Sequence, residues 1–179
     1  IGANVLTHLL GQSIEERGER IEIYRKTRAE RGLDPEAGRV TLMLHTFVGP
    51  DSDAVERAVH QPLKDYLKSA MFLVKSAAWQ FPTFKKMSDE QGKTLDEFFA
   101  TISDADMDAL LEFAFQRYFH TSGLFGTPNS CLEMVDKVKS ADVDEIACLI
   151  DFGIQTDVVL EHLPYLNELR AAAQQAIGV

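Results

Sequence analysis

The amino-acid sequence predicts an α/β fold, part of a (β/α)8 barrel of the TIM type with a helical insertion. Short apolar runs alternate with segments of helical spacing, an order typical of parallel strands joined by helices. The run 146–150 is apolar on both faces, as in a parallel strand covered on both sides. Three strands are expected, near 3–10, 39–48 and 144–151, which is few for so many helices. A partial barrel accounts for this shortage and is favoured over the second interpretation, a doubly wound sheet.

The chain opens inside this repeating pattern. Residues 3–10 already read as a strand, and no charged segment followed by an apolar run precedes them, so a signal peptide is not indicated. Because the first residue is Ile1 and not methionine, we expect a piece of a longer protein. A capping box at Ser13 and Glu16 then begins a helix that is expected to end at Gly32.

The second unit and its helix follow directly. After the strand 39–48, Asp51 caps a predicted helix of about 25 residues, in which Pro62 predicts a kink or a break. Residues from about 77 to 122 interrupt the alternation and are interpreted as a helical insertion within one domain, 1–179. Its lysines, in an otherwise acidic chain, favour a mobile lid. A permanently docked insertion is the alternative, held by apolar residues such as Phe98, Phe99, Leu110 and Phe115.

The stretch 124–153 predicts a complete unit: a turn bounded by glycines, a helix and a buried strand. Thr127 is the expected N-cap of the helix, and Pro128 fits its first position because no amide donor is needed there. A last helix is expected to begin at Thr156 and to turn its leucines inward, namely Leu160, Leu163, Leu166 and Leu169.

Composition argues against two classes of partner. A formal net charge of −10 disfavours nucleic acid, because binding to phosphates depends on clustered lysine and arginine. No apolar run approaches the ~20 residues of a membrane-spanning helix, so no membrane partner is expected. Cys131 and Cys148 fall at predicted core positions, and free thiols in a cytoplasmic protein are favoured over a disulfide. Short motifs for metals and nucleotide phosphates are absent from the sequence.

The candidate site residues lie where the predicted strands end, because a parallel barrel carries its reactive groups at the carboxyl ends of strands. They are Thr7 and His8 in the first strand, Met43, His45 and Phe47 in the second, and Asp151 and Phe152 after the third. Asp151 would orient a ligand hydroxyl or cap the following turn, and the sequence leaves both open.

The second strand has two different faces. Alternation places Thr41, Met43, His45 and Phe47 on one face, and Leu42, Leu44, Thr46 and Val48 on the face that packs against helices. His45 is therefore expected to point into the barrel, where an imidazole can transfer a proton or bind an anion. A hydrogen-bonded core histidine is the alternative interpretation.

Three blocks carry a resemblance to a known family: NVLTHLLGQS, RVTLMLHTFVGPD, and GTPNSCLEMVDKV followed by VDEIACLIDFG. In this order they resemble the C-terminal half of the bacterial luciferase-like flavin monooxygenases, most closely the branch associated with nonribosomal peptide and polyketide synthases. The resemblance implies a (β/α)8 barrel that binds reduced FMN at its C-terminal face and uses dioxygen to oxygenate an organic substrate, small or carrier-bound. A flavin reductase that supplies the FMN and a homodimer are the further partners considered.

The same resemblance implies roles for particular residues. His45 matches an active-site histidine of the family, whereas Met43 stands where alkanesulfonate-type relatives carry arginine, which disfavours a sulfonate-like anionic substrate. His8 corresponds to an active-site aromatic position, and Phe152 falls near a tyrosine of relatives. The cofactor or substrate pocket would be completed by Thr7, Phe47 and Asp151. The family's flavin-phosphate segment would precede the first strand and is not contained in this sequence.

Other classes of function stay open at this point. A non-catalytic helical interaction module, or an inactive barrel fragment, would account for the acidic helices and for the absence of a complete short catalytic motif. A barrel hydrolase would need paired carboxylates at strand ends, and Asp151 alone qualifies.

Overall fold

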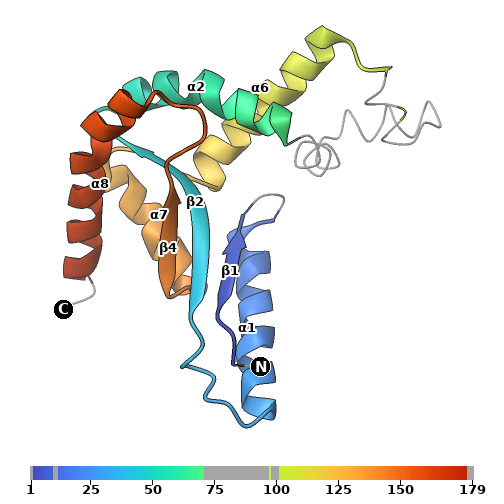
Figure 1. Ribbon diagram of the computed structural model, residues 1–179, viewed down its shortest axis with the longest axis vertical. Coiled ribbons are helices and arrows are strands. Elements are labelled where there is room, and N and C mark those ends of the chain that lie inside the picture. Colours follow the sequence, from blue (N-terminus) through green and yellow to red (C-terminus); the bar gives the residue numbers. More distant parts are fainter. Residues whose placement is uncertain (1, 10–11, 71–96, 98–100, 177–179) are drawn as a thin grey trace.

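The computed structural model of the chain describes residues 2–9, 12–70, 97 and 101–176 (Figure 1). In this part of the chain, the strands and helices follow one another in the order β1 (Val5–His8), α1 (Ile14–Glu30), β2 (Val40–Val48), α2 (Ser52–Ser69), α6 (Asp104–Thr121), β3 (Leu124–Gly126), α7 (Pro128–Ser140), β4 (Glu145–Leu149) and α8 (Thr156–Ala176).

The sheet is parallel and β2 is its central strand. β1 pairs with the first half of β2, from Val5 opposite Val40 to His8 opposite Met43. β4 also pairs in parallel with this part of β2, and ends with Leu149 opposite His45. The three predicted strands are therefore confirmed as parallel neighbours. Their closure into a barrel stays a prediction, because the described strands form an open sheet.

A fourth strand, β3, was not expected from the sequence. Its three residues pair with the end of β2, where Leu124 lies opposite Thr46 and Gly126 opposite Val48. The sequence pattern indicated a turn between glycines here, because three residues are too few to show the alternation of a strand. The short strand continues the sheet beside the carboxyl end of β2.

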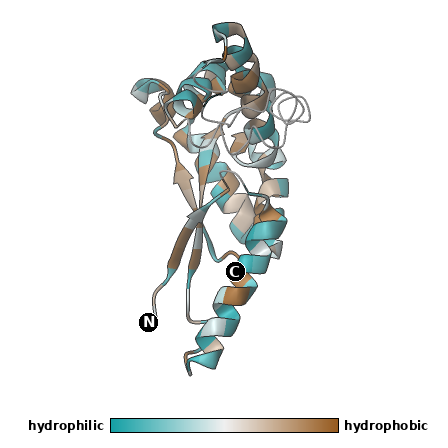
Figure 2. Ribbon diagram, turned by 90° about the vertical axis from the view of Figure 1, so that its right-hand side faces the viewer, coloured by the Kyte–Doolittle hydropathy of each residue, from teal (hydrophilic) through white to brown (hydrophobic). Residues whose placement is uncertain are grey.

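The alternation along β2 correctly predicted which residues share a face, but both faces pack against helices, whereas one was expected to point into a barrel. Leu42, Leu44 and Val48 belong to a cluster that we call the sheet core, completed by Leu9, Leu124, Cys131, Met134, Val138 and Leu169. Phe47, on the opposite face, belongs to a second cluster, the helical core, with Phe152 and residues of α2 and α6 such as Val59, Leu63, Leu110 and Phe115. Figure 2 shows the strands as a predominantly hydrophobic part of the molecule.

The N-terminal caps of the helices are largely those predicted. Ser13 and Glu16 form the capping box of α1, and the side chain of Asp51 accepts from the amide of Ala54 at the start of α2. Thr127 caps α7, and its hydroxyl accepts from the amide of Ser130. These side chains satisfy amides that have no partner inside the first turn of a helix.

The break that was considered at Pro62 does not occur, whereas a kink there stays a prediction. α2 runs unbroken from Ser52 to Ser69, and it is shorter than the expected 25 or so residues. The missing amide of Pro62 weakens the helix locally, but the apolar stripe on both sides of it, including Val59 and Leu63, is almost completely buried. Burial of this stripe holds the helix together across the proline.

The part of the insertion that the structure describes is docked. Leu110, Ala114 and Phe115 of α6 are fully buried in the helical core against α2. Lys64 of α2 is 6% exposed and forms ion pairs with Asp108 and with Glu112 of α6, at 2.9 and 3.1 Å. Residues 77–96 and 98–100 of the predicted lid lie outside the described residues, so lid closure stays a prediction.

Two predictions of burial are wrong at the edge of the sheet. β4 was expected to be covered on both faces, yet Cys148 is exposed and Ile146 and Leu149 are only half-buried. In α8, Leu169 is buried, whereas Leu160 and Leu163 are 56% and 38% exposed. The physical reason is shared, since no described strand or helix lies on the outer side of β4 and α8. Cys131 is buried, and both thiols are free, as the sequence favoured.

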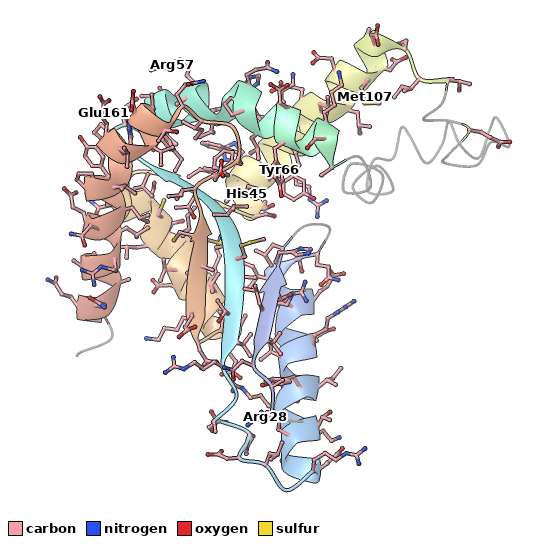
Figure 3. The ribbon with its side chains drawn as sticks, in the orientation of Figure 1. Arg28, His45, Arg57, Tyr66, Met107 and Glu161 are labelled. Carbon is pink, nitrogen blue, oxygen red and sulfur yellow. The ribbon has the colours of Figure 1, made fainter. Side chains whose placement is uncertain are left out.

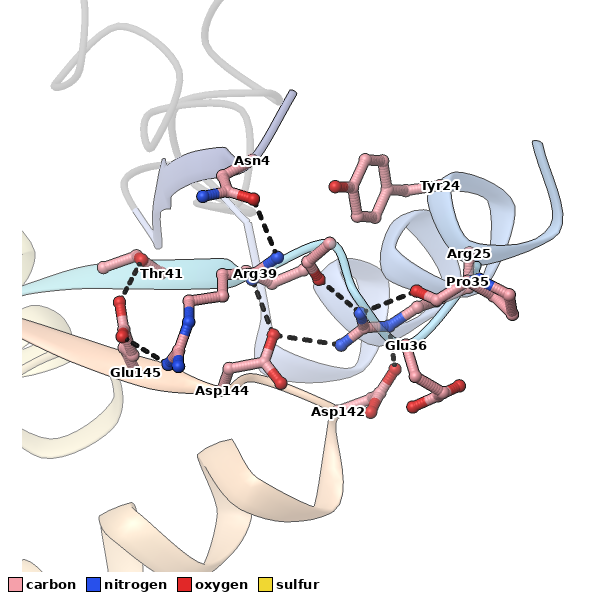
Figure 4. Close-up of polar contacts among 12 residues, drawn as sticks. Asn4, Tyr24, Arg25, Pro35, Glu36, Arg39, Thr41, Asp142, Asp144 and Glu145 are labelled. Atoms are coloured by element: carbon pink, nitrogen blue, oxygen red, sulfur yellow. Dashed lines mark hydrogen bonds and ion pairs between the residues drawn. The ribbon is translucent and has the colours of Figure 1, made fainter. Parts of the chain in front are cut away.

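A buried arginine ties α1 to the amino end of the sheet (Figure 4). Arg25 forms ion pairs with Asp142 at 2.8 Å and with Asp144 at 3.0 Å, and it donates to the carbonyl of Gly38. Asp144 also accepts from the amide of Val40 at 2.6 Å. The group therefore links α1 with the first residues of β2 and with the turn that enters β4. We call these residues the Arg25 clamp.

Candidate active site

His45 lies near the carboxyl end of β2 in a slot lined by aromatic rings, and 7% of its surface is exposed. The ring of Tyr66, from α2, meets the imidazole edge-to-face with centroids 4.6 Å apart. The ring of Phe152, from the loop after β4, meets it in the same manner at 5.4 Å. Figure 3 shows Tyr66 below α2, close to His45. Side chains of two consecutive elements, β2 and α2, thus meet at this imidazole with one from the distant loop after β4.

The Nε2 atom of His45 is buried and has no hydrogen-bond partner among the described residues. Leaving a buried polar atom without a partner costs about 1–3 kcal/mol. The great majority of buried polar atoms in proteins are paired, and the exceptions include catalytic groups and groups that meet a ligand. Nε2 of His45 is therefore available to hydrogen-bond a bound molecule.

The slot keeps His45 uncharged. Burial lowers the pKa of His45 to about 4, because the charged imidazolium loses its water, and the nearby His8 adds a smaller repulsive contribution. Near pH 7 the ring is a neutral imidazole, with one nitrogen that donates and one that accepts. This state favours hydrogen bonding or proton transfer over the anion binding that the sequence also allowed.

The end of β1 contributes His8 to the same face as His45. His8 pairs with Met43 in the sheet, and paired residues of parallel strands project to one side. Partial burial lowers the pKa of His8, and the guanidinium of Arg17, which donates to the His8 carbonyl at 2.6 Å, lowers it further. Thr7 pairs with Leu42 and so lies on the opposite face. The structure brings His8 and Met43, but not Thr7, to the side of His45.

The loop after β4 presses Phe152 beneath α2. Phe152 is 4% exposed, whereas the neighbouring Asp151 is exposed to solvent. The following residue, Gly153, has φ of +105°, a conformation that favours glycine, and a Cβ built there would lie 3.6 Å from Pro62. The glycine therefore lets the loop turn sharply against α2 and fixes Phe152 beside His45.

Phe47 has a different neighbour. Its ring stacks on His162 of α8, with centroids 4.4 Å apart and planes 29° from parallel. Nδ1 of His162 lies 2.8 Å from the carbonyl of Val158, one turn earlier in the helix. Phe47 thus anchors α8 to the end of β2, and the structure shows it as a packing residue beside the slot.

A hollow of about 480 Å³ adjoins the slot on the outside. It lies between the second half of α2 and the loop after β4, and two of its walls are the rings that contact His45. The lining is formed by Tyr66, Phe152 and Gly153, together with Gln61, Pro62, Asp65 and Ser69.

Tyr66 was not singled out from the sequence. It lies on the apolar side of α2, whose buried apolar residues are otherwise aliphatic. A hydroxyl-bearing ring among buried aliphatic side chains was the signal that could have singled it out. Its approach to His45 depends on how α2 lies over the sheet, which the spacing of residues does not reveal.

The sequence profile of the luciferase-like monooxygenases matches residues 1–145, about four fifths of the chain. The chain belongs to this family. No curated protein matches the sequence.

Luciferase-like monooxygenases are oxidoreductases that generally use a reduced flavin, dioxygen and a small-molecule substrate. The matched region includes β1 and β2, and with them His8 and His45, and it ends at the first residue of β4. The resemblance is thereby confirmed at the level of the family, although most of the block 143–153 lies beyond the match. The placement in the C-terminal half and the branch associated with peptide and polyketide synthases stay predictions. None of the helices in the described part of the chain has the length and apolarity to cross a bilayer.

Proposed function

We propose that the chain forms one wall of the active site of an FMN-dependent monooxygenase, in which His45 meets the flavin or the substrate. The observation that carries this proposal is the buried, unpartnered Nε2 of His45 at the carboxyl end of a parallel strand. In parallel barrels the reactive groups gather at this edge. The family match supports a flavin-dependent oxygenation as the chemistry.

The residues around His45 suit a reduced flavin. Its ring system is a flat apolar surface with hydrogen-bonding atoms along one side, and the slot offers aromatic rings beside one unpaired nitrogen. Bound FMN would supply the electrons for the activation of dioxygen. His45, His8 and Met43 are the residues that would face it.

This chain's own residues supply positioning and a proton site. The neutral imidazole of His45 can hold or pass a proton at Nε2, and its low pKa makes it a ready donor once it is protonated. Tyr66 and Phe152 exclude water from that atom, which strengthens hydrogen bonds within the slot. Met43 leaves the face of the sheet beside His45 without a positive charge.

We further propose that additional strands complete a (β/α)8 barrel along the open edges of the sheet. On the face of His45, Leu6 is 69% exposed, although it belongs to a strand that would be covered in a closed barrel. An apolar groove of about 490 Å³ runs beside β4, lined by residues that include Val143, Ile146, Cys148 and Leu169. Uncovered apolar surface of this kind is typical of an interface.

The resemblance to enzymes associated with nonribosomal peptide and polyketide synthases supports a narrower assignment. The substrate would then be a natural-product intermediate, free or carrier-bound, in a cytoplasmic enzyme. A flavin reductase that delivers reduced FMN, and a homodimeric assembly, belong to the same proposal. The family match argues against a non-catalytic interaction module.

An anaerobic titration of the complete protein with reduced FMN tests the proposal, followed by turnover measurements on His45→Ala. Loss of a proton-transferring group is expected to lower turnover by about 10²-fold or more. His162→Ala, at the neighbouring histidine that stacks on Phe47, is the matched control and should retain turnover if the protein stays folded. An absence of flavin binding to the complete protein, or full turnover of His45→Ala, would overturn the proposal.

A further inference from the structure

The hollow beside the slot has a lining whose chemistry points to a class of ligand. Its walls are the rings of Tyr66 and Phe152, the backbone of Gly153 and the ring of Pro62, and its lining is mainly apolar. Gly153 packs against Pro62, so that the hollow ends where the loop after β4 touches α2. A volume of about 480 Å³ suits a small organic molecule.

The charge of the residues around the hollow narrows the class of ligand further. Among the described residues of the lining, Asp65 is the only acidic or basic one, and its carboxylate accepts from the amide of Gln61 at 2.8 Å. The nearby Lys64 of α2 is turned away and is paired with carboxylates of α6. Arg17, in the first turns of α1, donates to the carbonyl of His8 and is not among the described residues of the lining. An anionic ligand would therefore find a negative charge in the hollow and no compensating cation among those lining residues that the structure describes.

A further polar atom, Nε2 of His45, lies behind the two rings. His45 contacts both Tyr66 and Phe152 and keeps an unpaired Nε2. His45 itself does not line the hollow, so a ligand there reaches Nε2 through a rotation of Tyr66, whose side chain is only half-buried. A neutral hydroxyl, carbonyl or amide that reached Nε2 would satisfy it, whereas a purely apolar molecule would leave the atom unpaired.

We propose that this hollow binds an uncharged organic molecule, a ring or alkyl group with one hydrogen-bonding function, and that this function meets Nε2 of His45. The proposal rests on the proposed monooxygenase function, because it names the substrate class of the same site: neutral and apolar. It assigns to Tyr66 and Phe152 the selection of the apolar group and to His45 the orientation of the polar one.

Two probes of equal ring size separate neutral from anionic ligands. Phenol carries one neutral hydroxyl, and benzoate carries a full negative charge on the same ring. Each is titrated into the full chain, and binding is followed by NMR of the His45 imidazole and the Tyr66 ring. We expect phenol to shift both sets of signals and to bind at least about tenfold more tightly than benzoate. Equal or tighter binding of benzoate, or phenol binding without a shift at His45, would overturn the proposal.

Variants test the hydrogen bond itself. His45→Phe keeps a ring in the slot but removes Nε2, and phenol affinity should fall about tenfold, the worth of one hydrogen bond. His162→Phe, outside the hollow, should leave it unchanged. Circular dichroism of each variant verifies the fold, and the comparison of the two probes in the unaltered chain requires no variant. An unchanged affinity in a folded His45→Phe variant contradicts the proposal.

A flavin titration of the complete protein keeps the two hypotheses apart. Flavin binding without preferential binding of phenol would overturn the neutral-ligand proposal and leave the monooxygenase function standing. Phenol binding at His45 without any flavin binding would overturn the monooxygenase function and leave the neutral-ligand proposal standing.

Discussion

The two ends of the sheet differ in how their buried polar groups are paired. At the amino end, Arg25 is buried but paired with Asp142 and Asp144, and Asp144 also holds the amide of Val40. At the carboxyl end, His45 is equally buried but uncharged, and its Nε2 has no partner among the described residues. A buried polar group whose hydrogen bonds are all formed helps to fix the structure, whereas an unpaired polar atom can still form a hydrogen bond with a ligand. The contrast matches the general division of parallel barrels into a stabilising end and a reactive end.

The largest expected effect concerns the uncharged state of His45. Its pKa of about 4 lies below the 6.5 of an unfolded histidine, so the unfolded chain binds the proton more readily. Stability due to His45 is therefore complete above about pH 7 and is lost as the pH falls, by about 3 kcal/mol at pH 4. Urea unfolding of the unaltered chain and of His45→Phe over this range measures the effect. If the free energy of unfolding changed with pH in the same way in both proteins, the buried, uncharged state of His45 would not be supported.

At the other end of the sheet, Asp144→Ala should weaken the fold by about 2–3 kcal/mol. The change takes one carboxylate from the buried Arg25 and the acceptor from the amide of Val40. Glu145→Ala is the matched control, since the pair of Glu145 with Arg39 is exposed and should be worth about 0–1 kcal/mol. Urea unfolding near pH 7 compares them. Similar losses of stability in both variants would show that the Arg25 clamp stabilises the fold no more than an exposed ion pair does.

A smaller effect is expected at the loop that positions Phe152. Gly153→Ala should destabilise the chain by about 1–2 kcal/mol because φ of +105° is unfavourable for alanine. The opposite sign is expected for Gly18→Ala, inside α1, where a Cβ would meet Ala141 at an ordinary 3.7 Å and helix propensity improves by about 1 kcal/mol. Thermal unfolding of both variants measures whether Gly153→Ala lowers the stability and Gly18→Ala raises it. A neutral Gly153→Ala would mean that the loop has another conformation available.

Much of the fold follows from local patterns in the sequence, but its long-range contacts do not. The alternation of residues along β2 predicted both of its faces, and the cap at Thr127 predicted where α7 begins. The Arg25 clamp joins residues 117 and 119 positions apart, and no local pattern marks such partners. The outward position of Leu160 was unpredictable for a related reason: helical spacing defines a stripe, while the neighbours of the helix decide whether the stripe is covered.

The same limit applies to the candidate site. His45 was identified from its strand end and its face, which depend on residues close in sequence. Its aromatic neighbours come from α2 and from the loop after β4, and their approach depends on the path of the chain between these elements. The value of Tyr66 became visible only with the position of α2 over the sheet.

The central place of β2 has a consequence for the order of folding. Its partner on one edge, β1, precedes it by a single helix, but its pairing with β4 joins Thr41 to Glu145, 104 residues later. At synthesis rates of about 5–20 residues per second, one edge of β2 waits roughly 5–20 s for this partner. An exposed edge of a strand invites wrong pairing. Newly made chains should therefore depend on chaperones during this interval, long before any flavin or substrate could stabilise the finished site.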